Sequence, residues 1–226
     1  MKNSRQHVQK LKKLFTALKK GTEKSKKPLF SDFIESLVFA VLCEKSSESS
    51  AKAAIKKILS HFVDFNDLRV ARIEEISEII GADIEEPEKC ALRLTMLLNA
   101  IFQKYDCLSP EELLNAGKKN TQEILAKLNG MSAFVCDYIL LTVLNSHTVP
   151  MTEKMTQYLK TYGIVDRDAD NAQVMSFIGR QITMANAYTF YSLIRHDSEL
   201  ANHKAAQILG EDKSKSAAQK KSKPKK

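Results

Sequence analysis

The residues with the most specific chemical pattern lie between two apolar stretches of helical spacing. They are Asn129, Gly130, Met131, Ser132 and Ala133. A tight turn between two helices exposes backbone N–H groups at the start of the second helix, where the helix dipole adds partial positive charge. A glycine and a small residue let a phosphate come close to the backbone. The pattern predicts a phosphate-binding hairpin that needs no basic side chain. The alternative is an ordinary helix–turn–helix connection that contains a glycine.

The spacing of the four cysteines, by contrast, does not match that of a metal site or a disulfide framework. They are Cys43, Cys90, Cys107 and Cys136, with no CxxC pair among them and no histidine cluster nearby. This spacing supports neither a metal site nor a disulfide framework. Each cysteine has apolar neighbours, which is typical of a small buried residue in a reducing compartment. We therefore expect no metal ion.

The net charge of +8 is unevenly distributed along the chain. Residues 1–27 carry +9, residues 211–226 carry +5, and residues 28–210 carry −6. The lysines of the last segment, called the C-terminal lysines below, are Lys213, Lys215, Lys220, Lys221, Lys223, Lys225 and Lys226. Basic segments of this kind attract polyanions such as nucleic acid. The alternative for the C-terminal lysines is a segment that only keeps the protein soluble.

Helical spacing of apolar residues continues along almost the whole chain. Residues 8–18 form an amphipathic pattern closed by Gly21, and residues 33–42 are apolar on most sides, as in a central helix. No alternation of period two predicts a strand, so we expect an all-α protein with roughly ten helices.

Two further features bear on the surroundings of the protein. No apolar run reaches the about eighteen residues needed to cross a bilayer. Residues 1–5 lead into a lysine-rich helical pattern rather than the apolar stretch of a secretion signal. We therefore expect a soluble intracellular protein with no membrane partner.

Three segments together resemble a known family. Residues 128–136 align with a hairpin of the form L-P-G-V-G-x-K-T-A, with Gly130 on its first glycine. Residues 149–155 stand where that family has V-P-V-D-T-H-V, and residues 33–42 look like its first barrel helix. The chain thus resembles the helix-hairpin-helix DNA glycosylase superfamily, in particular its endonuclease III-like branch. The likeness covers about residues 8–196 in helix order.

The resemblance implies two helical subdomains with a DNA-binding cleft between them. Residues 30–145 would form a six-helix barrel-like subdomain that ends in the helix-hairpin-helix at 121–144. Residues 146–205 would form the second subdomain, on which the basic helix and linker of residues 1–29 would pack. We expect residues 206–226 to form a disordered lysine-rich tail, because residues 211–226 contain no apolar side chains beyond two alanines.

The chain departs from the family at the positions that carry its chemistry. The family's catalytic lysine, an amine that attacks the sugar, is replaced by Phe134, and its catalytic aspartate is replaced by Thr152. If the family resemblance is set aside, Phe134 is interpreted as an ordinary packing residue and Thr152 as an ordinary helix cap. The second hairpin glycine is Ser132, and the polar residue that the family inserts into the DNA stack falls near Glu44-Lys45. The iron–sulfur cysteines that follow the last helix in many members are missing, so we expect no cofactor.

These observations favour a non-catalytic DNA-binding relative of the glycosylases. It would contact duplex DNA mostly at the backbone, through residues 129–133, Lys45 and the C-terminal lysines, and act as a monomer in the cytoplasm, associated with the nucleoid, or in the nucleus. One alternative is an active glycosylase or abasic-site lyase with relocated groups, for which Glu153 and Lys154 are the candidates. The other is a protein-interaction scaffold, which the acidic charge of residues 28–210 favours.

Overall fold

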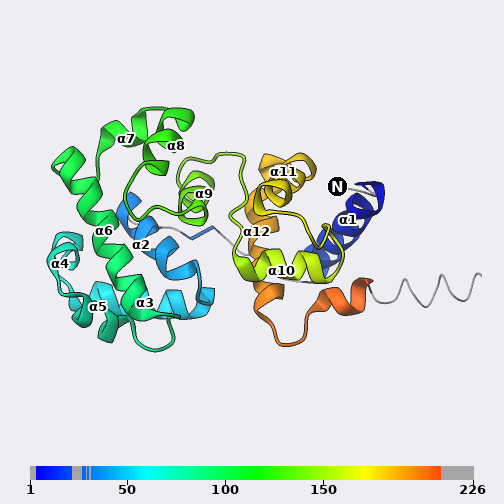
Figure 1. Ribbon diagram of the computed structural model, residues 1–226, viewed down its shortest axis with the longest axis horizontal. Coiled ribbons are helices and arrows are strands. Elements are labelled where there is room, and N and C mark those ends of the chain that lie inside the picture. Colours follow the sequence, from blue (N-terminus) through cyan, green and yellow to red (C-terminus); the bar gives the residue numbers. More distant parts are fainter. Residues whose placement is uncertain (1–3, 22–26, 29, 31, 210–226) are drawn as a thin grey trace, which may run out of the picture. The chain divides into compact units, whose positions relative to one another are not determined.

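The computed structural model describes residues 4–21, 27, 28, 30 and 32–209, and these are helical with no strand (Figure 1). The helices are α1 (Ser4–Gly21), α2 (Phe33–Cys43), α3 (Glu48–His61), α4 (Phe65–Val70), α5 (Ile73–Ile80), α6 (Pro87–Tyr105), α7 (Glu111–Asn115), α8 (Lys118–Ala126), α9 (Ala133–Thr142), α10 (Glu153–Thr161), α11 (Asn171–Gln181) and α12 (Met184–Glu199). The all-α expectation is confirmed. Within the described ranges, no helix is both long enough and apolar enough to cross a bilayer. The C-terminal lysines lie outside the described residues.

The chain divides into two compact units. Residues 27–152 form one, here called the central unit, and residues 1–26 together with 153–226 form the other, here called the terminal unit. Residues 146–152, expected in the second subdomain, therefore belong to the central unit. The reason is local: the Ser146 N–H donates to the Leu140 carbonyl at 2.7 Å, and Val149 is buried. Lys27, expected with the N-terminal segment, also belongs to the central unit, where its ammonium donates to Asn145 Oδ1 at 2.5 Å.

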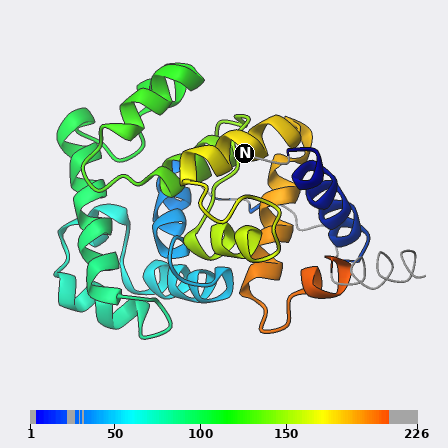
Figure 2. The same ribbon diagram turned by 45° about the vertical axis from the view of Figure 1, so that its right-hand side comes forward.

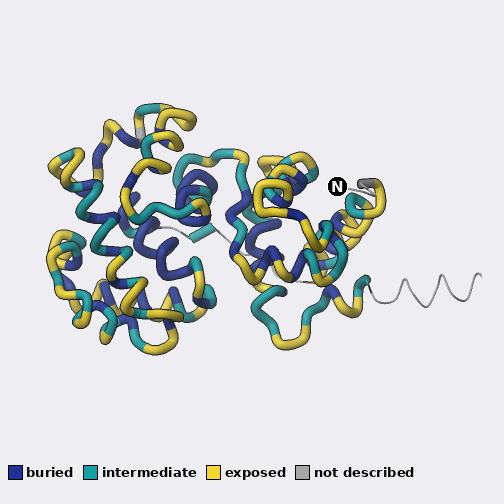
Figure 3. The backbone as a smooth tube through the Cα atoms, in the orientation of Figure 1, coloured by how far each residue is buried: buried dark blue, intermediate teal, exposed yellow. Residues whose placement is uncertain are grey.

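Helix α2 is the core of the central unit. Asp32 caps its start by accepting the Glu35 N–H at 2.8 Å. Every residue of α2 except Glu35 is buried, as expected for a helix that is apolar on most sides. It contacts α3, α6 and α9, and it is the most continuously buried segment of that unit (Figure 3).

Helix α6 contacts several other helices of the central unit. Pro87 opens it at the position where a missing N–H costs nothing. Along its length it contacts α5 and α4, and Arg69 of α4 donates to Asn99 and lies 4.0 Å from the centre of the Phe102 ring. Helix α6 also carries the residues on which the hairpin rests.

The terminal unit packs α1 against α12 (Figure 2). Leu11, Leu14 and Leu18 form the buried stripe of α1, and each contributes about 1.5–3 kcal/mol by leaving water. The rings of Phe15 and Phe190 meet edge to face with centroids 5.4 Å apart. The lysines of α1 lie mainly on its solvent side, where they are exposed.

The chain remains ordered beyond α12. Residues 204–209 form a further helical turn, so the expected disorder from residue 206 onward is wrong for 206–209. Its start is fixed by the buried carboxylate of Asp197, which accepts the N–H groups of Lys204 at 2.9 Å and Ala205 at 3.2 Å. Asp197 also accepts the Tyr158 hydroxyl at 2.5 Å, so one carboxylate ties this turn to α10 and α12.

Candidate nucleic-acid interface

The hairpin between α8 and α9 begins with a closed four-residue turn. The Met131 N–H donates to the Leu128 carbonyl at 3.1 Å. Gly130, in the third position, has a φ of +87°, whereas the φ of Asn129 is not positive. This is the type II arrangement, which requires a residue that tolerates positive φ at that position. The glycine of the hairpin is therefore a requirement of its turn.

Gly130 also lies directly against α6. A Cβ atom at this position would be 3.2 Å from Leu97 Cγ, 3.3 Å from Met96 Cβ and 3.5 Å from the Arg93 carbonyl oxygen. A side chain would fit only if Leu97 and Met96 moved by a few tenths of an ångström. Close packing on α6 thus explains this glycine independently of any phosphate, and no local spacing predicts that contact.

The start of α9 presents backbone donors at an exposed corner. Ser132 caps the helix with extended backbone (φ −109°, ψ 163°), and its hydroxyl accepts the Val135 N–H at 3.1 Å. The N–H groups of Gly130, Ser132 and Ala133 donate to no other described residue. Asn129 and Ala133 are exposed, while Met131 and Ser132 are half-buried. With the partial positive charge of the helix end, these donors suit an anionic oxygen.

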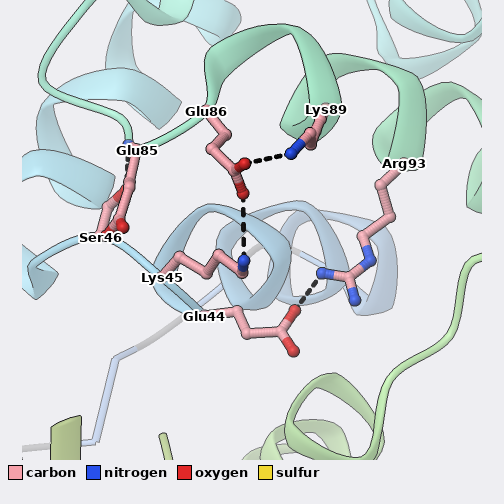
Figure 4. Close-up of polar contacts among 7 residues, drawn as sticks. All are labelled: Glu44, Lys45, Ser46, Glu85, Glu86, Lys89 and Arg93. Atoms are coloured by element: carbon pink, nitrogen blue, oxygen red, sulfur yellow. Dashed lines mark hydrogen bonds and ion pairs between the residues drawn. The ribbon is translucent and has the colours of Figure 1, made fainter. Parts of the chain in front are cut away.

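The side chain of Arg93 links the hairpin to the end of α2. Arg93 of α6 donates from Nε to the Gly130 carbonyl at 3.1 Å. Another nitrogen of its guanidinium forms an ion pair with Glu44, which Figure 4 shows. Glu44 directly follows α2. Arg93 was not among the residues singled out from the sequence, because a lone arginine on a helix gives no sign of a partner 37 positions away.

Lys45, a predicted DNA contact, lies on the rim of a cavity of about 230 Å³ between the end of α2 and the start of α6. Its ammonium is 3.0 Å from Glu86 Oε2, and Lys89 pairs with the same carboxylate (Figure 4). The hydrogen bonds from Lys89 and Lys45 lower the pKa of Glu86. On the loop beside them, the Glu85 N–H donates to Ser46 Oγ at 2.8 Å. The structure thus pairs Lys45 with Glu86.

Cys90 lines the same cavity. Burial raises the pKa of its thiol to about 12, and the nearby Arg93 guanidinium only partly offsets this. A thiol of that pKa is almost fully protonated at neutral pH and is a poor nucleophile or metal ligand. Among the described residues, no cluster of histidine, cysteine or acidic side chains is arranged to hold a metal ion.

Positions 134 and 152 carry neither an amine nor a carboxylate. The Phe134 side chain is buried, with its ring centroid 6.1 Å from that of Tyr138. Thr152 is buried at the end of the central unit and immediately precedes α10. Glu153 and Lys154, the candidates for relocated chemistry, are both exposed in the first turn of α10.

One carboxylate near the hairpin could not be predicted from the sequence pattern. Asp137 lies in the second turn of α9, and its Oδ1 accepts the Thr148 hydroxyl at 2.9 Å. Burial raises the pKa of this carboxyl group, although the hydrogen bond from Thr148 opposes the shift. A perturbed carboxyl group is a common mark of functional sites, although structural pairs produce it too.

Comparison with known proteins identifies the architecture. Neither a protein-family profile nor a curated protein sequence matches the chain. Solved structures do match: an endonuclease III in a non-covalent complex with DNA has a TM-score of 0.72 at 14% identity, covering 93% of this chain and 98% of that one. A thermostable thymine-DNA glycosylase has a TM-score of 0.67 at 14% identity, covering 91% and 94%. The chain has the helix-hairpin-helix DNA glycosylase fold.

A third structure with this glycosylase fold is the 3-methyladenine DNA glycosylase of H. pylori bound to 1,N6-ethenoadenine. It matches with a TM-score of 0.61 at 20% identity, covering 87% of this chain and 97% of that one. Identities this low establish the fold alone. What the glycosylase fold does in this chain has to be argued from its own residues.

Charge distinguishes the two units of this glycosylase fold. Lysine and arginine counted against aspartate and glutamate give +13 for residues 1–26 and 153–226, and −5 for residues 27–152. Much of the positive charge lies in α1 and in the C-terminal lysines. An acidic central unit gives its hairpin little long-range attraction for a polyanion.

Proposed function

We propose that the protein binds duplex DNA and performs neither base excision nor cleavage at abasic sites. The observation that carries this proposal is the pair of residues at 134 and 152, a buried phenylalanine and a buried threonine. A phenyl ring cannot attack a sugar carbon, and a hydroxyl group supplies no negative charge to stabilise a developing cation. The glycosylase fold supports DNA as the ligand.

Binding would combine one local contact with a general attraction. The N–H groups of Gly130, Ser132 and Ala133 hold one phosphate, because they lie at a helix start and donate to no other described residue. The terminal unit, which includes the C-terminal lysines, contributes most of the affinity through its +13 charge. Contacts of both kinds are to the DNA backbone, so little sequence preference is expected.

The proposal is tested with the full-length protein and duplexes containing an abasic site, uracil or an oxidised pyrimidine. We expect mobility shifts with all three and with undamaged duplex, no strand cleavage, no released base, and no covalent adduct after borohydride reduction. A borohydride-trapped adduct that disappears when a particular lysine is replaced would contradict the proposal.

Retained catalysis is the second candidate, and one observation favours it. Asp137 is a partly buried carboxylate of raised pKa in the second turn of α9. If the assays above detect base release, Asp137→Asn identifies its source. Activity abolished by this substitution, with DNA affinity unchanged, would assign the relocated carboxylate to Asp137. Activity that survives it would exclude Asp137 from the chemistry.

A further inference from the structure

The peptide group between Gly130 and Met131 is held at both of its ends. Its N–H donates to the Leu128 carbonyl at 3.1 Å, and its carbonyl accepts Arg93 Nε at 3.1 Å. The peptide is trans and planar, so its N–H and C=O point in opposite directions. Two hydrogen bonds on opposite sides therefore fix the plane of the Gly130–Met131 peptide, which leads through one further peptide into Ser132 and the start of α9.

The Arg93 guanidinium is itself held in position. One nitrogen donates to the hairpin and another pairs with Glu44, whose side chain is only 18% exposed, against 30% for Arg93. A planar group with several fixed donors can bind two partners in defined directions, which a lysine ammonium cannot do as rigidly. Among the described residues, Arg93 is the only donor to the Gly130 carbonyl.

We infer that Arg93 is a positioning residue for the hairpin and that Glu44 sets its orientation. The Glu44–Arg93–Gly130 link fixes the direction in which the N–H groups of Ser132 and Ala133 point. It makes the hairpin's capacity to hold a phosphate depend on an ion pair at the end of α2. The inference about geometry stands on the contacts, and its consequence for binding rests on the proposed function.

Reversing the ion pair distinguishes a positioning role of the Glu44–Arg93–Gly130 link from a role that only stabilises the fold. In the double variant Glu44→Arg/Arg93→Glu, opposite charges still face each other, but a glutamate cannot donate to the Gly130 carbonyl. Arg93→Met removes both contacts. Glu44→Gln is a milder variant that keeps Arg93 and removes its charged partner. Lys89→Met is the matched control, because Lys89 lies one turn before Arg93 on α6 and pairs with Glu86 instead.

The readout of hairpin geometry is the set of backbone amide resonances of Ser132 and Ala133, measured by NMR without DNA. We expect Arg93→Met and the reversed pair to shift both resonances alike, Glu44→Gln to shift them less in the same direction, and Lys89→Met to leave them unchanged. The urea midpoint of the reversed pair should lie closer to that of the wild type than the midpoint of Arg93→Met.

The consequence for binding is measured with inorganic phosphate and with a 20-base-pair duplex. We expect the phosphate-induced shifts of the two amides to disappear in Arg93→Met and in the reversed pair, and duplex affinity to fall about five- to tenfold. If the reversed pair recovers the wild-type resonances, or if Arg93→Met never changes them, Arg93 is not a positioning residue. If the resonances shift as expected while wild-type protein shows no response to phosphate, the positioning role stands and the phosphate site of the proposed function fails.

Discussion

The environment of Asp137 predicts how the free energy of unfolding changes with pH. Burial raises the pKa of its carboxyl group above the model-compound value of 3.8. The folded protein then holds this proton more tightly than the unfolded chain, so the free energy of unfolding falls as pH rises from 3.8 through the folded-state pKa. Asparagine stays neutral at every pH, so it does not lose stability through the ionisation of a buried carboxyl group. We expect Asp137→Asn to gain stability relative to the wild type between pH 4 and pH 7, as measured by urea unfolding.

The control for this prediction is Thr148→Val, which removes the hydrogen bond that opposes the shift. It should steepen the loss of stability with rising pH, because the buried carboxylate then lacks its donor. An Asp137→Asn variant whose stability relative to the wild type does not vary with pH would place the titration of Asp137 outside the folding equilibrium.

At the scale of single elements, much of the helical order could be predicted from sequence patterns. The apolar composition of residues 33–42 predicted a central helix, and α2 is buried nearly throughout. The stripe of residues 8–18 predicted an amphipathic helix, and its leucines are buried against the terminal unit. Such patterns are local, because a helix requires its own residues to recur on one face.

The unforeseen parts of the hairpin depend on contacts between distant residues. Gly130 was assigned to phosphate approach, whereas its packing on Met96 and Leu97 follows from the way α6 passes the turn. Lys45 was assigned to DNA, but Glu86 pairs with it across 41 positions. No spacing rule connects such residues, so only the folded structure reveals them.

The N–H donors of the hairpin are best tested by a substitution that leaves the turn intact. Gly130→Val would collide with α6, so Ala133→Pro is preferable. Ala133 is the first, exposed residue of α9, and proline is well tolerated there because the preceding Ser132 is extended. It removes one N–H and occupies the approach of a phosphate. We expect duplex affinity to fall about three- to tenfold, which corresponds to the roughly 0.5–1.5 kcal/mol of one hydrogen bond.

The control for Ala133→Pro is Asn171→Pro, at the equivalent exposed position of α11 after the extended residue Asp170. It makes the same backbone change in the terminal unit and should leave duplex affinity unaltered. Equal affinities for Ala133→Pro and the wild type, with helical content preserved by circular dichroism, would remove the hairpin from the binding surface.

At the scale of the whole molecule, charge and fold point to different parts of the chain. The proposed phosphate contact is a hairpin in the central unit, yet residues 27–152 carry −5 and the terminal unit +13. The central unit should repel a polyanion at long range and hold it only through aligned N–H donors. Salt dependence separates the two contributions, because it reports how many phosphates are neutralised by cations.

The C-terminal lysines provide the test of that division. Replacing all seven, from Lys213 to Lys226, with glutamine preserves chain length and removes +7. If about four of them neutralise phosphates, the slope of log K against log salt becomes shallower by roughly 3.6, and affinity at 0.15 M salt falls about 10²- to 10³-fold. Fluorescence anisotropy with a labelled duplex at several salt concentrations measures both quantities.

The residual binding should disappear when the exposed lysines of α1 are also replaced, since the central unit has no net positive charge to sustain it. An unchanged slope in the glutamine variant would instead assign the affinity to the folded units and leave the C-terminal lysines a role in solubility.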